Sequence, residues 1–260
     1  MLSWVSAGVT ALGISALAVM AGGAQAADAP AATSAATLTP EARAALEGMS
    51  AYLRGLKSFE VTGEGNSEAA LDSGQKIEFG VGLRYLVAQP GKLVAEFSIG
   101  ARQRQMFYDG ATLTIAAPDL NYFAQVPMTG SLRTLLDAAS AKYDLELPLA
   151  GLFRWGDPSR PLEMPTSGQK VGTAKCGIGV CNQYAFRQTG FDWQIWIPQA
   201  GAPLPVRFVV NGRVGKAPPH TAMNLSWKTD VPVAADRFAF VAPAGATRIP
   251  IKSAGQAGGK

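Results

Sequence analysis

The residue types that most often perform catalysis are scarce in this sequence. His220 is the only histidine, so a Ser-His-Asp or Cys-His arrangement would have to use it. It follows Ala217-Pro218-Pro219, a string typical of a turn ahead of a strand. The sequence contains no G-x-S-x-G motif, no P-loop and no metal-ligand cluster. These observations predict a protein that is not an enzyme and that needs no cofactor or metal.

Carboxylates are the second set of residues that could do chemistry. Glycoside hydrolysis, for example, requires only two of them on either side of the scissile bond. Asp109 precedes a glycine and Asp157 lies between a glycine and a proline, as turn residues do. The others are expected at solvated positions: Asp119, Asp137, Asp144 and Glu146. A hydrolase of unknown substrate therefore stays an alternative hypothesis.

The two cysteines, Cys176 and Cys181, are separated by four residues that include Gly177 and Gly179. This spacing is not the C-x-x-C of a redox motif, and a zinc site would need further ligands. Residues typical of strands follow the second cysteine. We therefore predict a hairpin whose loop is closed by a Cys176–Cys181 disulfide, a bond that persists in oxidising compartments.

Aromatic and leucine side chains are the remaining candidates for a site. Packing in the hydrophobic core is the alternative explanation for each of these side chains. Trp193 and Trp196 stand three apart on a predicted strand and so face opposite sides of it. We predict a cavity for a hydrophobic ligand, lined by Phe79, Tyr85, Phe97, Phe107 and Trp193 from strands and by Leu135, Leu136 and Trp155 from a helical insert.

The first secondary-structure element that we expect along the chain is a helix. Thr39 suits an N-cap and Pro40 the first helical position. Leu46, Met49, Leu53 and Leu56 follow at steps of three, four and three, which places them on one helical face. The spacing predicts a helix that ends near residue 57.

After this helix, the spacing of apolar residues changes to every second position, as in a β-strand. Apolar residues occupy every second position from Ile77 to Val87, and Gly80 and Gly82 between them leave room for bending. Asp109-Gly110 indicates a hairpin. Further strands are predicted from residue 59, at 93–99, 102–108, around 113–115, at 121–126, and at 168–174, 181–189, 192–197, 204–211 and 221–228.

Residues 130–155 interrupt the strands. A helix opened by Ser131 is expected first, followed by a short helix or loop at 148–155. The order predicts an α+β protein, mainly β: one curved antiparallel sheet of about ten strands that forms an unclosed half-barrel, with an N-terminal helix. The insert either plugs this half-barrel as core or forms a lid over a cavity.

The ends of the chain predict export. Residues 1–26 carry no charged side chain and end in Ala24-Gln25-Ala26, as a secretory signal peptide does; a retained anchor is the alternative. A flexible leader at 27–38, a half-barrel domain at 39–252 and a disordered tail at 253–260 are expected to follow. The net charge of +4 is not clustered, so we expect no nucleic-acid partner.

Several strings resemble the lipoprotein-carrier (LolA-like) superfamily of periplasmic proteins: Phe107-Tyr108-Asp109-Gly110, Pro90-Gly91-Lys92-Leu93, and residues 238–246. This resemblance implies an unclosed β-barrel with a helical lid that holds acyl chains. In the carriers an Arg precedes the strand-ending proline and keeps the lid closed. Gln89 stands at that place here, so the resemblance does not extend to this contact.

The chain is more closely similar to an uncharacterised family of predicted periplasmic proteins, a domain of unknown function within that superfamily. Longer strings carry this similarity: residues 49–53, 56–59, 147–150, 153–156, 184–188 and 192–197. The similarity implies the location and the fold and no established activity.

The leading hypothesis is therefore a periplasmic, non-enzymatic carrier or binding protein for a lipid or acyl chain. We expect it to be a monomer, with an envelope protein as a possible partner. The alternative from a different class is an envelope sensor or interaction module of the same fold that carries no ligand.

Processing gives the first testable prediction. Cleavage after the Ala24-Gln25-Ala26 site is expected to leave Ala27 as the mature N-terminus, within a residue or two. N-terminal sequencing of the exported protein measures it. A membrane-bound form that begins at Met1 would contradict the prediction and indicate an anchor.

Overall fold

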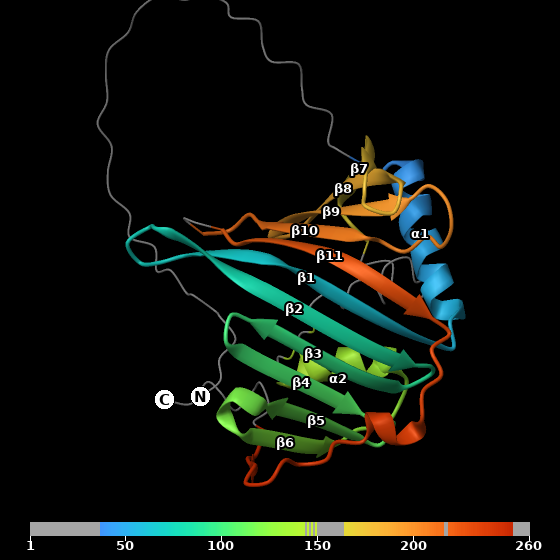
Figure 1. Ribbon diagram of the computed structural model, residues 1–260. Helices are drawn as coiled ribbons and strands as arrows, with labels where there is room; N and C mark the ends of the chain where they lie inside the picture. The colour runs from blue at the N-terminus through green and yellow to red at the C-terminus, as the bar shows by residue number, and fades with distance from the viewer. Residues whose placement is uncertain are drawn as a thin grey trace, which may run out of the picture. The chain divides into compact units, whose positions relative to one another are not determined.

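Alternating apolar side chains organise most of the chain into one sheet of twelve strands (Figure 1). The computed structural model describes residues 37–143, 145, 147, 149, 164–215 and 218–251. The expected signal peptide, most of the leader, the tail and Trp155 lie outside these residues. The predicted strand at 77–87 is β2 (Lys76–Ala88), and its odd-numbered residues from Val81 to Val87 are buried.

Two antiparallel meanders form the sheet and meet at one strand pair. The first contains β1 (Ser58–Ala70), β2, β3 (Lys92–Ile99), β4 (Arg102–Tyr108), β5 (Thr112–Ala117) and β6 (Tyr122–Pro127). The second contains β7 (Ser167–Lys175), β8 (Val180–Gln188), β9 (Phe191–Pro198), β10 (Arg207–Gly212) and β11 (His220–Thr229). β1 pairs antiparallel with β11 and joins the two meanders.

The sheet is unclosed, as predicted, because β7 and the short β12 (Thr247–Arg248) are at the two ends of the strand order. The number of strands, about ten in the prediction, is corrected to twelve. β12 pairs in parallel with β6, and the sequence analysis did not anticipate this addition. The pairing of β12 with β6 includes a backbone hydrogen bond in which the Thr247 N–H donates to the carbonyl of Asn121.

The N-terminal helix is α1 (Pro40–Gly55), close to its predicted bounds. The Thr39 hydroxyl accepts a hydrogen bond from the Ala42 N–H at 3.3 Å, so Thr39 is the expected cap. Leu46, Met49 and Leu53 are buried. No helix among the described residues is long and apolar enough to cross a membrane.

The helix predicted after Ser131 is α2 (Leu132–Tyr143), and its N-terminus is fixed to the sheet. The Leu132 N–H donates to the Pro90 carbonyl at 2.8 Å, and the Tyr108 hydroxyl donates to the Gly130 carbonyl at 2.8 Å. A Cβ on Gly91 would lie only 2.5 Å from that Gly130 oxygen, so the turn before β3 fits closely against the start of α2. α2 lies behind β3 and β4 in Figure 1.

Both helices pack against the same face of the sheet, which we call the inner face. One apolar core joins Leu46 and Met49 of α1 with Leu135 and Leu136 of α2. The strands contribute deeply buried residues to it: Phe59, Val61, Tyr85, Leu93, Ala95, Tyr108, Leu113, Trp193 and Ile195. Trp193 and Trp196 do face opposite sides, as predicted: Trp193 is buried in this core, whereas Trp196 lies under Arg207 on the outer face.

The C-terminal segment covers part of the outer face. Phe238, in the short helix η4 (Ala235–Phe238), is buried with Leu86 and Val94 in a second, smaller cluster. Phe240 contacts the rings of Phe107 and Phe123, with centroids 5.3 and 5.1 Å away. These contacts explain the apolar residues at even-numbered positions of β2 and β3, which simple alternation would place in water.

Two glycines on β1 permit the close approach of β11. A Cβ on Gly63 would lie 2.5 Å from the Met223 sulfur and 2.9 Å from Leu225. A Cβ on Gly65 would overlap the carbonyl oxygen of Ala222 and lie 2.7 Å from the Cα of Met223. The sequence analysis assigned the bending to Gly80 and Gly82 instead. A Cβ at Gly80 would meet nothing within 4 Å, so that position does not require glycine on grounds of space.

Gly65→Ala is therefore expected to destabilise the protein by about 2 kcal/mol or more, because overpacking against backbone is not relieved by side-chain rotation. Gly80→Ala is the matched control, since it adds the same methyl group to open space on the neighbouring strand; a change below about 0.5 kcal/mol is expected. Chemical denaturation measures both. Equal stability of the two variants would show that the β1–β11 approach does not depend on Gly65.

The predicted disulfide joins Cys176 to Cys181 across the β7–β8 turn, with their Cα atoms 5.9 Å apart. The loop is short, so the bond removes little chain entropy from the unfolded state, worth about 2 kcal/mol. Cys176→Ser with Cys181→Ala is expected to lower the free energy of unfolding by about this amount and to leave the inner face intact. Free thiols in unreduced periplasmic protein would contradict the prediction.

Candidate functional site

The inner face has two halves with different environments. The half that we call proximal bears the turns at 89–91 and 109–111, and α2 begins there. The distal half bears the β1–β2 turn at 71–75, the β3–β4 turn at 100–101 and the short helix η1 (Pro118–Leu120). In the proximal half, inner-face residues such as Leu93 and Tyr108 are completely buried. Burial also raises the pKa of the Tyr108 hydroxyl, and the charge of Asp109 adds to this effect.

In the distal half, large apolar residues on the same face stay accessible. Phe79 is 38% exposed and Ile99 is 44% exposed, as is Tyr122 on β6. Strand register places them on the inner face, because Val81 pairs with Ile99 and Ala117 pairs with Tyr122. Three neighbours on the same face are half-buried: Ile77, Phe97 and Ile115. We call this set of six residues the distal apolar surface.

The residues predicted to line a cavity are distributed between several environments. Phe79 and Phe97 belong to the distal apolar surface. Tyr85, Leu135, Leu136 and Trp193 are buried in the closed core, each at most 3% exposed. Phe107 lies on the opposite side of the sheet, beside Leu86, Val94 and Phe238, and Trp155 lies outside the described residues. The structure thus places Phe79 and Phe97 on the same half of the inner face and Phe107 on the opposite face.

Two arginines of β4 lie within the distal apolar surface, between Phe97 and Ile99 of β3 on one side and Ile115 and Tyr122 of β5 and β6 on the other. Arg104 pairs in register with Phe97, and Arg102 pairs with Ile99, so both share the inner face with Met106 and Tyr108. The Arg104 guanidinium donates to the Asp119 carboxylate at 2.7 Å, and the two side chains are 13% and 21% exposed. The sequence analysis did not select these arginines. Their alternation with Met106 and Tyr108 is the signal that would have placed them on the same face of β4 as these two apolar residues.

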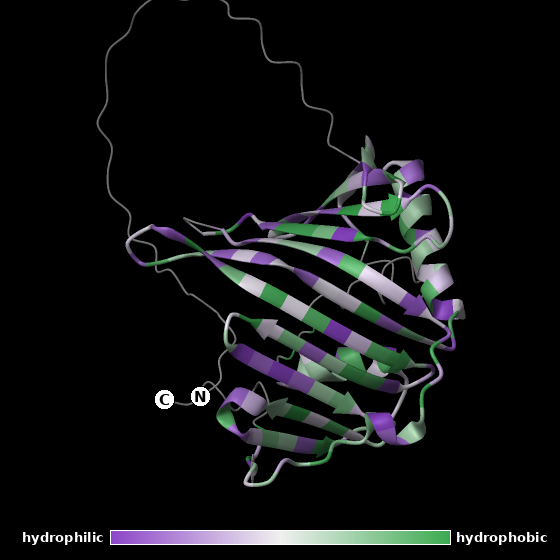
Figure 2. Cartoon of the chain, viewed as in Figure 1, coloured by the Kyte–Doolittle hydropathy of each residue, from purple (hydrophilic) through white to green (hydrophobic). Residues whose placement is uncertain are grey.

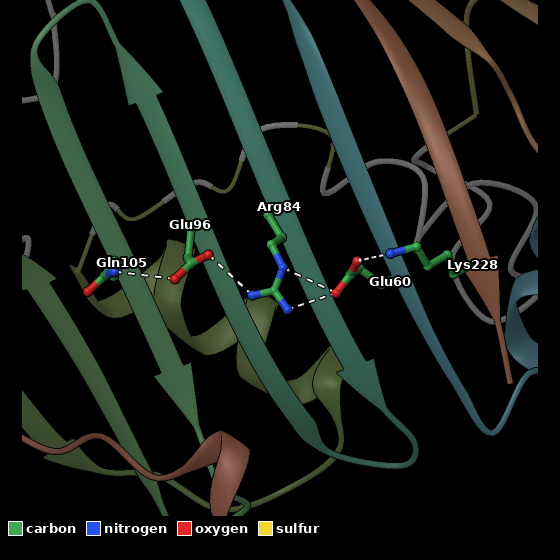
Figure 3. A network of polar contacts seen from close by, with 5 residues as sticks. All are labelled: Glu60, Arg84, Glu96, Gln105 and Lys228. Carbon is green, nitrogen blue, oxygen red and sulfur yellow. Dashed lines mark hydrogen bonds and ion pairs between the residues drawn. The ribbon is translucent and has the colours of Figure 1, made fainter. Parts of the chain in front are cut away.

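The outer face, by contrast, is organised by polar contacts across neighbouring strands. Figure 2 shows hydrophilic and hydrophobic residues alternating along β2, and Figure 3 shows how the polar ones connect. The carboxylate of Glu60 accepts from Arg84 at 2.7 Å and from Lys228 at 3.1 Å. Arg84 also donates to Glu96 at 3.3 Å, and Gln105 donates to Glu96 at 3.3 Å. This network links five consecutive strands, from β11 to β4.

These contacts determine the charge state of the Glu60 carboxylate. Partial burial would raise the pKa of Glu60, but hydrogen bonds from Arg84 and Lys228, together with their charges, hold it below its ordinary value. The network therefore keeps Glu60 ionised at neutral pH. Every carboxylate in it is paired with a cation or an amide, which is the arrangement of a structural network rather than of an acid–base pair poised for catalysis.

The candidates for catalysis have ordinary structural partners. A ring nitrogen of His220 lies 2.7 Å from the side-chain oxygen of Asn211. Asp109 accepts from the N–H groups of Ala111 and Thr112, as a turn residue does. Among the described residues, no group of three or more His, Cys, Asp or Glu side chains is placed to hold a metal ion.

Comparison with solved structures found proteins of low sequence identity. An uncharacterised conserved protein from Thermus thermophilus is 13% identical, with 81% of this chain and 99% of that chain covered and a TM-score of 0.48. LprF from Mycobacterium bovis is 13% identical, with 81% and 100% covered and a TM-score of 0.39. A LolA superfamily protein from Nitrosomonas europaea is 12% identical, with 76% and 97% covered and a TM-score of 0.36.

No curated protein matches the sequence. A family model does match: the model described as "Predicted periplasmic protein (DUF2092)" covers residues 42–252. These bounds contain both helices and all twelve strands except the first residues of α1. The match agrees with the family resemblance of the sequence strings and with the half-barrel fold. The chain belongs to this family of predicted periplasmic proteins.

Proposed function

We propose that this protein is a periplasmic, non-enzymatic binding protein that holds a hydrophobic ligand, a lipid or acyl chain, against the distal half of its inner face. The observation that carries the proposal is the exposure of Phe79, Ile99 and Tyr122 on the face that is elsewhere the core. Large exposed apolar patches are uncommon on monomeric proteins and mark sites of interaction. Phe79 and Ile99 lie next to the β3–β4 turn, and Tyr122 lies on the same face across β4 and β5.

The energetic argument favours a chain-like ligand. Each methylene group that leaves water contributes about 0.8 kcal/mol, so an acyl chain that covers several of these side chains reaches micromolar affinity with few polar contacts. Tyr85, Leu135 and Leu136 are buried in the closed core and offer no accessible surface. The proposed ligand site is therefore the accessible part of the inner face, at Phe79, Phe97 and Ile99.

Fluorescence of an uncharged long-chain alcohol probe tests this proposal. Saturable binding at micromolar concentrations is expected for the wild type. Phe79→Ser with Ile99→Ser is expected to weaken binding about tenfold or more, because two apolar contacts are lost. Both side chains are only partly accessible, so a modest loss of stability is expected as well, and thermal unfolding verifies that the variant folds.

Ile178→Ser with Val180→Ser is the matched control. These two residues are 71% and 50% exposed in and beside the β7–β8 turn, at the proximal end of the sheet. The control is expected to bind like the wild type. Absence of saturable binding, together with no lipid in protein purified from its own envelope, would overturn the proposal and favour the interaction module.

A further inference from the structure

The two arginines at the distal end stand on the core-facing side of the sheet. Arg102 is exposed and makes no ion pair within the described part of the chain. Arg104, one step closer to the core, is mostly buried and paired with Asp119. Placing guanidinium groups on an inner face beside apolar residues is costly unless an anion or water satisfies them.

The apolar residues next to these arginines lie around the β3–β4 turn and on the strands beside it. The Phe79 ring lies beside the β3–β4 turn, since a Cβ on Gly100 would be 3.5 Å from its Cδ1 atom. Ile99 precedes this turn and Arg102 follows it, paired in register. Phe97 and Arg104 form the next pair toward the core. Apolar and cationic side chains therefore lie on adjacent strands, about 5 Å apart.

The charges of the surrounding strands favour an anion. On strands β1 to β6, no described residue that shares the inner face by register is acidic. Glu68 and Lys76 pair with each other at 3.3 Å on the outer side of the β1–β2 hairpin. Asp119 balances Arg104, so the local sum of Arg102, Arg104 and Asp119 is one positive charge.

We propose that the ligand is a single-chain amphiphile with a monoanionic head group, bound by Arg102 and Arg104 while its acyl chain covers the distal apolar surface. This proposal rests on the proposed function. Guanidinium groups form paired, charge-assisted hydrogen bonds with carboxylate or phosphate oxygens. A fatty acid and a lysophospholipid with one phosphodiester both supply this chemistry, and a neutral alcohol of the same chain length does not.

Three fluorescent probes with equal acyl chains test the proposal: a fatty acid, lysophosphatidylglycerol and the corresponding alcohol. At least one anionic probe is expected to bind more tightly than the alcohol, and the tighter of the two identifies the head group. Arg102→Gln is expected to weaken anionic binding about three- to fivefold, the loss typical of an accessible charged contact, and to leave alcohol binding within twofold. Added salt is expected to narrow the difference between the probes.

Arg237→Gln is the control, because Arg237 is equally exposed but lies in η4, outside the inner face. Arg104→Gln combined with Asp119→Asn removes the buried pair without leaving a single charge, and thermal unfolding verifies that the variant folds. Equal affinity of all three probes, or an equal loss for alcohol and anion in Arg102→Gln, would overturn the head-group proposal alone. Absence of binding by every probe would overturn the proposed function as well.

Discussion

The pairing of β1 with β11 is the constraint on which the rest of the sheet depends. The two strands lie more than 150 residues apart in the chain, yet they are the only link in register between the two meanders of the described sheet. Their backbones approach so closely at Gly65 that a methyl group there would overlap the opposite carbonyl. The absence of two side chains on the inner face of β1 thus lets one sheet continue across the junction and curve around both helices.

The two faces of that sheet are stabilised in different ways. On the outer face, Glu60, Arg84 and Glu96 connect neighbouring strands through ion pairs that are partly accessible to solvent. Individually such pairs contribute little, but as a cross-strand network they favour one register over its alternatives. On the inner face, α1 and α2 close the core with leucine and methionine side chains. The helices account for the buried half of this face and leave Phe79 and Ile99 accessible.

The two halves of the inner face differ in how well their side chains are matched by partners. On the outer face, Glu60, Arg84 and Glu96 are paired within the cross-strand network, and His220 lies beside Asn211. The distal half of the inner face instead combines apolar area with two arginines. The proposed amphiphile would use both features, its acyl chain against the apolar residues and its head group at the arginines.

The sequence by itself determined the local elements. Period-two alternation identified β2 and β3, the Thr39-Pro40 cap identified α1, and the short spacing of Cys176 and Cys181 identified a disulfide. These features depend on contacts between residues that are close in the chain, so the spacing of residues in the sequence predicts them. The half-barrel itself was recognised with the help of family resemblance, because strand order is a long-range property.

Tertiary structure alone decided which apolar residues stay accessible on the inner face. Phe79 and Phe107 both follow strand periodicity, but the C-terminal segment covers Phe107 through Phe240, a contact between residues more than 130 positions apart. Tyr85 and Leu136 are buried because α2 is held at Pro90, which no local pattern encodes. Arg102 and Arg104 became candidates only when register placed them beside Ile99 and Phe97. Side-chain alternation shows which residues share a face of a strand. Long-range packing decides what covers each face: a helix, the C-terminal segment or solvent.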